Sequence, residues 1–343
     1  MNYMENEKRK KWLDMARGVA LLFVMVGHCI SSKSVLHHVL FTFHVPFFFI
    51  ISGYVYRYKR KSFVQDFVQL AFPYMVVTAF VMLSTKFLGE TSYYGNMRNV
   101  IKAAFLGSGV KHDGILPIGA VWFFPTIYFA RRYMDIIFAV GKKELQRASM
   151  VVGVVLAGVW LASKKVWLPL NIDVAMAAVL FMYTGYFLKQ KQFRLNAGTG
   201  LLALVIWGVA YFCGNFNLGT RKYEPWYITF SGAIAAGVIL LEICCRMEKM
   251  KMFSILNRFL AFTGRHTIAL LCIHDLDWRM PFPIWGAEFA AKMSAFPDQR
   301  LLTMIRRISY DYAILLCFLF LVHMIQKCGK KMREYYECKV QKQ

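Results

Sequence analysis

The sequence predicts an all-α integral membrane protein, a polytopic helical bundle of about ten transmembrane helices with both termini in the cytoplasm. Three observations predict this fold. Of the 343 residues, 58% are hydrophobic and only 18% are charged, whereas soluble domains typically have about 45–50% apolar and about 25% charged residues. The apolar residues gather in continuous runs close to the roughly 17–25 residues that cross a bilayer as a helix. The runs also lack the alternation of membrane barrel strands.

Ten apolar segments follow one another along the chain. They cover residues 13–30, 38–56, 69–88, 120–139, 149–163, 172–188, 199–213, 226–245, 262–284 and 308–326. Two of them, 149–163 and 199–213, are short for a membrane span. Because the sequence has no visible internal repeat or low-complexity linker, we expect residues 1–343 to form a single domain.

The distribution of charge predicts the topology. The chain holds 42 Lys and Arg against 19 Asp and Glu, a net charge of +23, which in a soluble protein would suggest nucleic acid as a partner. Here the cations lie in short runs between apolar segments, as in the cytoplasmic loops of membrane proteins. We therefore expect no nucleic-acid partner and a multi-pass protein of the cytoplasmic membrane. The basic ends 1–11 and 327–343 are then cytoplasmic, and the loops 89–119 and 277–307 lie outside.

The first apolar segment carries two ionisable residues, Arg17 and His28. Eleven residues apart on a helix, they lie about 20° from each other around the axis and about 16 Å apart along it. Ionisable groups inside a membrane are costly unless they are used or paired. Arg17 could instead extend to the cytoplasmic interface, and His28 could be a hydrogen-bonded histidine near the outer boundary.

Two further segments carry polar groups at comparable depths. The second segment contains FHVPFFFIISGYVY, in which His44 lies near the outer side and Pro46, Ser52 and Gly53 allow a kink or close packing. The ninth segment contains Thr263, Thr267 and His274 on one predicted helix face and ends beside Asp275 and Asp277. Either carboxylate could orient a histidine, or could cap the end of the helix.

Other chemistries lack their motifs. The sequence contains no HExxH, GxxxxGK[ST], GxSxG or GxGxxG, and its eight cysteines show no CxxC spacing. We therefore expect no metal site and no disulfide framework.

Six segments in order resemble the acyltransferase family 3 of integral-membrane O-acyltransferases. The first carries an arginine and a histidine separated by ten residues, Arg17 and His28, within LDMARGVALLFVMVGH. The others are FHVPFFFIISGYVY (43–56), FPYMVV (72–77), VWFFPTIYFA (121–130), LFMYTGYFLK (180–189) and TGRHTIALLCIH (263–274).

This resemblance implies transfer of an acyl group, commonly acetyl, from a cytoplasmic acyl-CoA to a hydroxyl of a cell-surface or lipid-linked glycan. The acyl-CoA is a co-substrate, so no bound cofactor is expected. The implied catalytic residues are His28, as base or acyl carrier, and Arg17, which would also hold the donor. The residues implied to bind the acceptor are His44, Ser52, Tyr54, Trp122, His274 and Asp275.

One departure from the family affects the donor site. Relatives often carry arginines before the third segment's Pro-Tyr pair, where this chain has QDFVQLAFPY with Gln65 and Gln69. The basic run that ends at Lys61 could compensate, so Lys61 is a candidate donor contact. The competing interpretation is a transporter, or a glycan flippase or polymerase, that uses intramembrane His and Arg.

Overall fold

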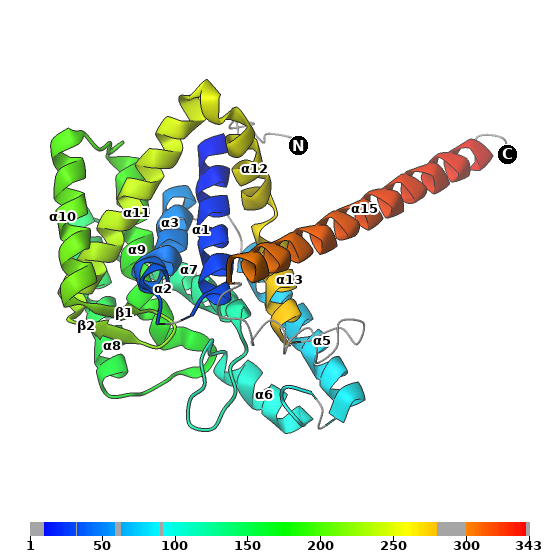
Figure 1. Ribbon diagram of the computed structural model, residues 1–343, viewed down its shortest axis with the longest axis horizontal. Helices are drawn as coiled ribbons and strands as arrows, with labels where there is room; N and C mark the ends of the chain where they lie inside the picture. Colours follow the sequence, from blue (N-terminus) through cyan, green and yellow to red (C-terminus); the bar gives the residue numbers. More distant parts are fainter. Residues whose placement is uncertain (1–9, 32, 59–62, 90–91, 280–299, 341–343) are drawn as a thin grey trace. The chain divides into compact units, whose positions relative to one another are not determined.

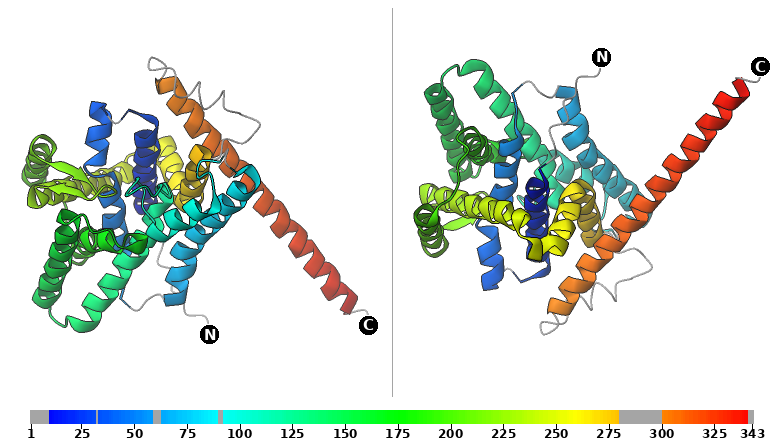
Figure 2. Two further views of the ribbon diagram at one scale, coloured as in Figure 1. Left: turned by 90° about the horizontal axis from the view of Figure 1, so that it is seen from below. Right: turned by 90° about the horizontal axis from the view of Figure 1, so that it is seen from above.

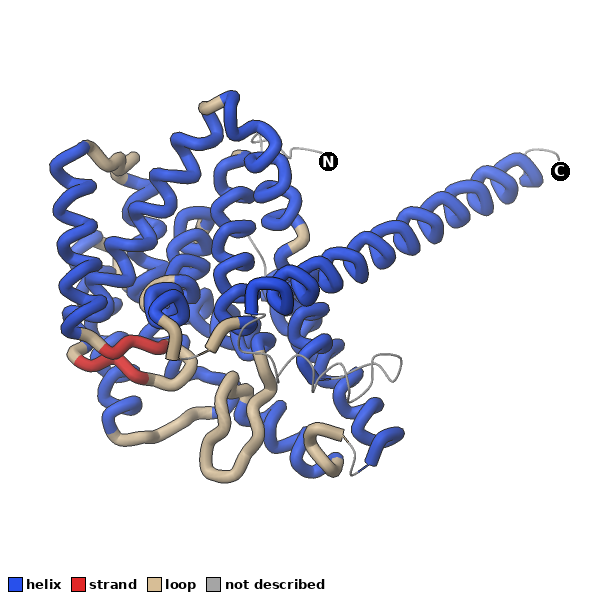
Figure 3. Tube along the Cα trace, in the orientation of Figure 1, coloured by secondary structure: helices blue, strands red, loops and turns tan. Residues whose placement is uncertain are grey.

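The computed structural model describes residues 10–31, 33–58, 63–89, 92–279 and 300–340, which are mostly helical (Figure 1). The chain divides into two units, residues 1–280 and 281–343. The described part of the second unit is one helix, α15 (Arg300–Val340). The predicted all-α class therefore holds, and a short two-stranded hairpin in the first unit is the one addition among the described residues (Figure 3).

The first half of the first unit runs from α1 to α7. Its helices are α1 (Lys11–Cys29), α2 (Val35–Phe41), α3 (His44–Val55), α4 (Phe63–Asp66), the π-helical turn η1 (Phe67–Ala71), α5 (Phe72–Leu88), α6 (Met97–Leu106), the 3-10 turn η3 (Ala120–Trp122) and α7 (Phe123–Val140).

The second half contains the hairpin. Its elements are α8 (Glu144–Ser163), the 3-10 turn η4 (Pro169–Asn171), α9 (Ile172–Gln190), α10 (Ala197–Cys213), β1 (Asn215–Asn217), β2 (Lys222–Glu224), α11 (Trp226–Lys249), the 3-10 turn η5 (Lys251–Phe253), α12 (Ser254–Arg265) and α13 (Thr267–Arg279). The two strands pair antiparallel, with Phe216 opposite Tyr223.

Seven helical stretches within the described residues are long and apolar enough to cross a membrane. They are Lys11–Cys29, Val35–Val55, Phe63–Leu88, Glu144–Ser163, Pro169–Gln190, Trp226–Lys249 and Met304–Gly329. The protein is thus a multi-pass membrane protein. Helix α7 carries Arg131, Arg132 and Asp135 and is not among the seven, and α10 is shorter, at 17 residues.

Helix α1 lies in the middle of the first unit, packed against α3, α11 and α12 (Figure 2). Glycines permit the closest approach. A Cβ on Gly18 would lie 2.1 Å from the Leu260 carbonyl oxygen of α12, and one on Gly264 would lie 1.7 Å from the Asp14 carbonyl oxygen of α1. Small residues let membrane helices approach backbone to backbone and gain dispersion energy. This contact fixes the helix that carries Arg17 and His28.

A second pair of glycines joins α3 to α9. A Cβ on Gly53 would lie 1.8 Å from the Met182 carbonyl oxygen, and one on Gly185 would lie 1.9 Å from the Ile50 carbonyl oxygen. Next to this contact Phe47 and Phe49 are fully buried. The Phe run of α3 is therefore mainly packing surface.

The predicted segment 38–56 is one span in length but two helices in structure. The chain breaks at Thr42 and Phe43, between α2 and α3. Pro46 explains the break, because it has no N–H to donate to the Thr42 carbonyl and its ring would clash with that carbonyl in a continuous helix. At the same break, Trp207 of α10 donates to the Thr42 hydroxyl, at 3.1 Å.

Residues 262–284 were predicted to form one continuous helix. In the described part of this segment the prediction is wrong. The helix changes direction at His266, so Thr263 belongs to α12 and His274 to α13, and the expected polar stripe is divided. The Thr263 and Thr267 hydroxyls donate to backbone carbonyls of the preceding turn, at 3.1 Å (Phe259) and 2.9 Å (Gly264). Such bonds compete with the helical ladder and bend helices.

The third segment begins earlier than predicted, at Phe63 rather than residue 69. A π-helical turn, η1, precedes Pro73 in the first turn of α5. Because proline cannot donate to the carbonyl four residues before it, the wider turn lets the helix pass the proline without ending.

We predict that Gly53→Ala destabilises the protein. The added methyl group has to displace the backbone of α9, and overpacking of this kind costs about 1–3 kcal/mol. Each kcal/mol corresponds to about 2–4 °C in melting temperature for chains of roughly 150–250 residues and to somewhat less for a longer chain, a shift that a thermal scan in detergent would resolve. Gly208→Ala in α10 is the control, because its Cβ would meet nothing within 4 Å. Equal melting temperatures for the two variants would contradict the packing argument.

Candidate active site

Two histidines from distant parts of the chain meet at the end of α1. His28 Nδ1 lies 3.3 Å from His274 Nε2, with the two ring planes within 10° of parallel and the ring centroids 5.4 Å apart. His274 is buried, at 1% exposure, whereas His28 is exposed. The buried His274 ring therefore contacts the exposed His28 ring, and only His28 is accessible to a substrate.

A cavity of about 250 Å³ opens beside His28. Its wall is largely apolar, and it includes the polar side chains of His28, His44 and Asn217. The full lining is Val24, His28, Phe41, His44, Val45, Pro46, Phe48, Gly109, Val110, Ala120, Trp122, Phe123, Phe216, Asn217, Leu218, Gly219 and Leu271. Three of the predicted site residues, His28, His44 and Trp122, thus share one cavity.

His44 enters the cavity with one nitrogen already bonded. Its Nδ1 donates to the Leu40 carbonyl at 2.8 Å, across the break between α2 and α3. In the neutral ring this leaves Nε2 as a hydrogen-bond acceptor. At the break between α2 and α3 the Leu40 carbonyl accepts from the Phe43 N–H, at 3.2 Å, and also from the His44 ring, and this second bond fixes the tautomer of His44.

Trp122 is held between two backbone segments. A Cβ on Gly109 would lie 2.3 Å from Trp122 Cδ1, and one on Gly219 would lie 3.6 Å from Trp122 Cζ2. Glycine at position 109 lets the loop after α6 approach the indole ring, whereas a Cβ at position 219 in the hairpin turn would only make ordinary contact with it. Trp122 thereby joins these two segments at the wall of the cavity.

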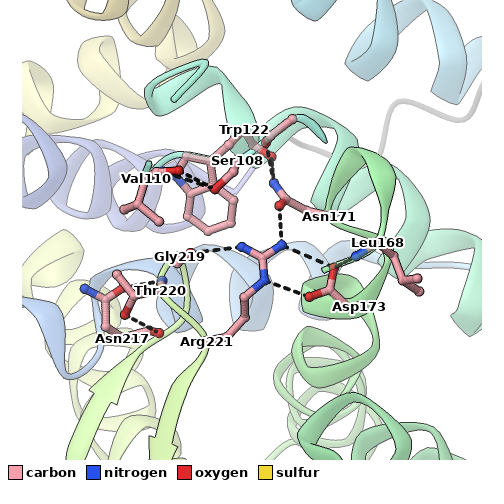
Figure 4. Close-up of polar contacts among 11 residues, drawn as sticks. Ser108, Val110, Trp122, Leu168, Asn171, Asp173, Asn217, Gly219, Thr220 and Arg221 are labelled. Carbon is pink, nitrogen blue, oxygen red and sulfur yellow. Dashed lines mark hydrogen bonds and ion pairs between the residues drawn. The ribbon is translucent and has the colours of Figure 1, made fainter. Parts of the chain in front are cut away.

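A buried arginine fixes the same segments (Figure 4). Arg221, at the end of the hairpin turn, donates from Nε to Asp173 Oδ2 at 2.7 Å and from Nη2 to Asp173 Oδ1 at 3.2 Å. Its Nη2 also donates to Asn171 Oδ1 at 2.8 Å, and its Nη1 to the Gly219 carbonyl at 3.2 Å. Both charged side chains are almost fully buried, at 2% and 1% exposure.

Asn171 extends this network to the loop and to η3. Its Nδ2 donates to the Gly107 carbonyl at 2.5 Å and to the Trp122 carbonyl at 3.4 Å. The Arg221 guanidinium also lies 3.6 Å from the centre of the Trp167 ring, a cation–π contact. One buried ion pair therefore connects the hairpin, the start of α9 and the 107–122 segment around the cavity.

Asp275 has a structural contact at the same end of the bundle. Its Oδ1 accepts a hydrogen bond from the Ala120 backbone N–H of η3. Neither Asp275 nor His274 is among the residues that line the cavity. Both lie directly behind it on α13, Asp275 anchoring that helix and His274 contacting His28.

Arg17 lies in the other half of α1. Its Nη1 donates to Asp14 Oδ1 at 2.9 Å, and its side chain is 30% exposed. Asp14 is buried, so the pair keeps a charged carboxylate acceptable in the packed interior. Arg17 and His28 keep the predicted separation of about 16 Å along one helix.

The structure places Ser52 and Tyr54 away from the His28 cavity. Both lie near the end of α3, at least eight residues and about 12 Å of helix from His44. Ser52 Oγ accepts from Arg131 at 3.4 Å. Tyr54 lines a separate cavity of about 830 Å³, together with Lys10, Lys11, Lys189 and Arg194. Their role in binding the acceptor stays a prediction.

Helix α7 places two arginines beside QDFVQLAFPY, the segment in which relatives often carry arginines and this chain does not. Arg131 Nη1 donates to Asp66 Oδ1 at 2.7 Å, and Arg132 contacts the other oxygen of the same carboxylate. Asp66 belongs to QDFVQLAFPY, so two guanidinium groups lie next to the position where the sequence offers only Gln65 and Gln69. The predicted donor contact Lys61 lies outside the described residues.

Sequence reasoning missed the Arg221 and Arg131 networks. The available signals were Asp173 at the start of one apolar segment and Asp66 beside another, since each carboxylate needs a partner in a membrane. Within the described residues, no group of three or more His, Cys, Asp or Glu is arranged to hold a metal ion.

Comparison with known proteins gives one match. The model of the acyltransferase 3 family, described as an acyltransferase domain, matches residues 10–322, a range that includes Arg17, His28, both networks and the cavity. No curated protein and no solved structure shows significant similarity to the chain. Because the match covers nearly the whole sequence, the chain belongs to the acyltransferase 3 family and is a membrane acyltransferase.

Proposed function

We propose that the protein transfers an acyl group, most simply acetyl, from a cytoplasmic acyl-CoA to a hydroxyl of a cell-surface or lipid-linked glycan. The observation that carries this proposal is the exposed His28 in a cavity shared with His44 and Trp122. Histidine is the side chain best suited to remove and return a proton near neutral pH.

The reaction balances with His28 as general base. His28 Nε2 takes the proton of the acceptor hydroxyl, and the oxygen forms a bond to the thioester carbonyl carbon. The carbon–sulfur bond then breaks, and the proton held by His28 goes to the departing thiolate. The products are the O-acyl ester and free coenzyme A, with no other reactant required.

The wall of the cavity supports a neutral acceptor. Among its described lining residues there is no carboxylate, lysine or arginine, while five are aromatic: Phe41, Phe48, Trp122, Phe123 and Phe216. Aromatic faces suit the C–H surface of a sugar ring, and the neutral His44 offers an acceptor atom for a second hydroxyl. Asn217 can both donate and accept.

The membrane arrangement supports a donor from the cytoplasm. We propose ten spans with both termini inside, in the cytoplasmic membrane, because most cations then lie on the cytoplasmic side. His28 is then near the outer boundary and Arg17 near the inner one. A long donor whose anionic groups meet Arg17 would place its thioester toward His28.

We predict that His28→Ala abolishes transfer without affecting folding. Loss of a general base typically costs about 10²–10⁴ in rate. The assay uses detergent-purified protein, acetyl-CoA and glycan extracted from cells that lack the gene, with acetyl transfer followed by mass spectrometry. His38→Ala is the control, because His38 is exposed on α2 and does not line the cavity. A folded His28→Ala protein with normal turnover, or an acyl group found covalently on His28, would contradict the base role.

We predict that Arg17→Lys raises the KM for acetyl-CoA more than it lowers kcat. A lysine preserves the charge beside Asp14 but cannot form the planar, two-pronged contact that a guanidinium makes with phosphate. One charge-assisted hydrogen bond is worth about 1.5–3 kcal/mol, so KM should rise about tenfold or more. Arg258→Lys, an exposed arginine on α12, should leave KM unchanged. An unaltered KM in Arg17→Lys would remove Arg17 from the donor site.

We predict that reporter fusions at residues 57–62, 189–196 and in the tail will report the cytoplasm. Fusions within 89–119 and 277–307 should report the outside, because the alternation of ten spans requires it. A tail outside the cell would mean that 149–163 or 199–213 does not cross the membrane. The depth assigned to His274, which follows both segments, would then be reversed.

A further inference from the structure

The pairing of His28 with His274 assigns a role to a residue behind the cavity. His274 does not line the cavity and is 1% exposed, yet its Nε2 is 3.3 Å from His28 Nδ1. The buried His274 ring lies nearly parallel to the exposed His28 ring and contacts it. His274 is therefore placed to act on His28 rather than on a substrate. This inference rests on the proposed function, in which His28 is the base.

The chemistry of a base determines the direction of the hydrogen bond. To accept a proton at Nε2, neutral His28 must carry its own proton on Nδ1. That N–H then donates to the Nε2 lone pair of His274, and neutral His274 must hold its proton on Nδ1. His274 therefore stabilises the tautomer of His28 that can act as a base, the part that a carboxylate plays in a Ser-His-Asp triad.

We propose that His274 is a positioning residue that fixes the reactive tautomer of His28 and shares its proton during transfer. When the acceptor proton reaches His28 Nε2, the Nδ1 proton of His28 can move toward His274 Nε2. The positive charge is then spread over two rings instead of one. When the thiolate leaves, the same proton returns and His28 gives its Nε2 proton to sulfur.

The surroundings are consistent with a pair of histidines in place of a histidine and a carboxylate. Among the described residues, the ionisable groups that contact His28 or share its cavity are His274 on α13 and His44 on α3, and Asp275 follows His274 on α13. The loop, η3 and hairpin segments that line the cavity contribute none among the described residues. Asp275 holds the backbone N–H of Ala120, so α13 is tied to η3 and the His274 ring is kept in place next to His28.

The test compares two substitutions of His274. In His274→Gln the side-chain oxygen can still accept from His28 Nδ1 but cannot take the proton, whereas His274→Leu can do neither. We expect kcat to fall about 10²-fold or more in the leucine variant, within the usual range of general acid–base effects, and less in the glutamine variant. The KM for acetyl-CoA should be unchanged in both. His266→Gln is the control, because the His266 ring bonds to the carbonyl of Phe262 in the preceding helix, α12, and not to His28.

Two readouts separate positioning from a structural role. The acidic side of the pH–rate profile should shift in both His274 variants, because the charge on His28 is no longer shared. In ¹⁵N spectra of histidine-labelled protein in detergent, the leucine substitution should change the tautomer signals of His28. If the leucine variant does not fold, the kcat and the pH profile of the glutamine variant decide, because glutamine keeps the hydrogen bond but cannot share the proton.

The outcomes distinguish this inference from the proposed function. Wild-type kcat, pH profile and His28 signals in both folded His274 variants would overturn the positioning role, even if His28→Ala is inactive. If the wild-type protein transfers no acyl group but its spectra show the coupled histidines, the proposed function fails and the pairing stands.

Discussion

The buried ion pair between Arg221 and Asp173 is the interaction on which the cavity depends. A charge taken out of water and left without a partner costs about 3–5 kcal/mol, much more than the net gain from a complete pair. The pair therefore tolerates few alternative arrangements, and two of its remaining hydrogen bonds, to Asn171 and to the Gly219 carbonyl, lead to segments of the cavity wall. Asn171 connects it to Gly107 and to the Trp122 backbone, and Gly219 is held directly. The loop after α6, the turn η3 and the hairpin turn are irregular or short. Their own secondary structure does not fix their positions, so the Arg221–Asp173 pair has to do so.

The helices beneath the cavity are fixed by a different force. Gly18 and Gly264 join α1 to α12, and Gly53 and Gly185 join α3 to α9. Between membrane helices the hydrophobic effect does not distinguish protein from lipid, so close backbone packing has to supply the attraction. Two different forces therefore act in different parts of the first unit. Dispersion sets the relative positions of the helices that carry His28 and His44, and electrostatics sets the positions of the loops that face them.

The sequence was sufficient for the class, the apolar segments and the first-span pair, because these depend on composition and on helical periodicity. His28, His44 and Trp122 could be assigned to one site because they occur in motifs of a recognisable family. Periodicity could not predict that His274 would contact His28, since 246 residues separate them and helix packing decides the contact. The division at His266 was missed for another reason: hydroxyl bonds to the backbone bend a helix without changing its hydropathy. Arg221 was missed because a single arginine in a loop carries no pattern until its partner Asp173 is known.

The first helix also explains why the two halves of the proposed reaction can be kept apart. Arg17 and His28 are on one rigid element whose close contact with α12 prevents sliding, so their separation of about 16 Å is fixed. Under the proposed function, a donor whose anionic groups bind at Arg17 reaches His28 only with an extended arm. Under the proposed function, the same separation keeps the charged end of the donor away from the cavity, which has no charged lining residue among those described. Holding a polyanion near one interface while a neutral hydroxyl is activated near the other lets the membrane itself separate the two substrates.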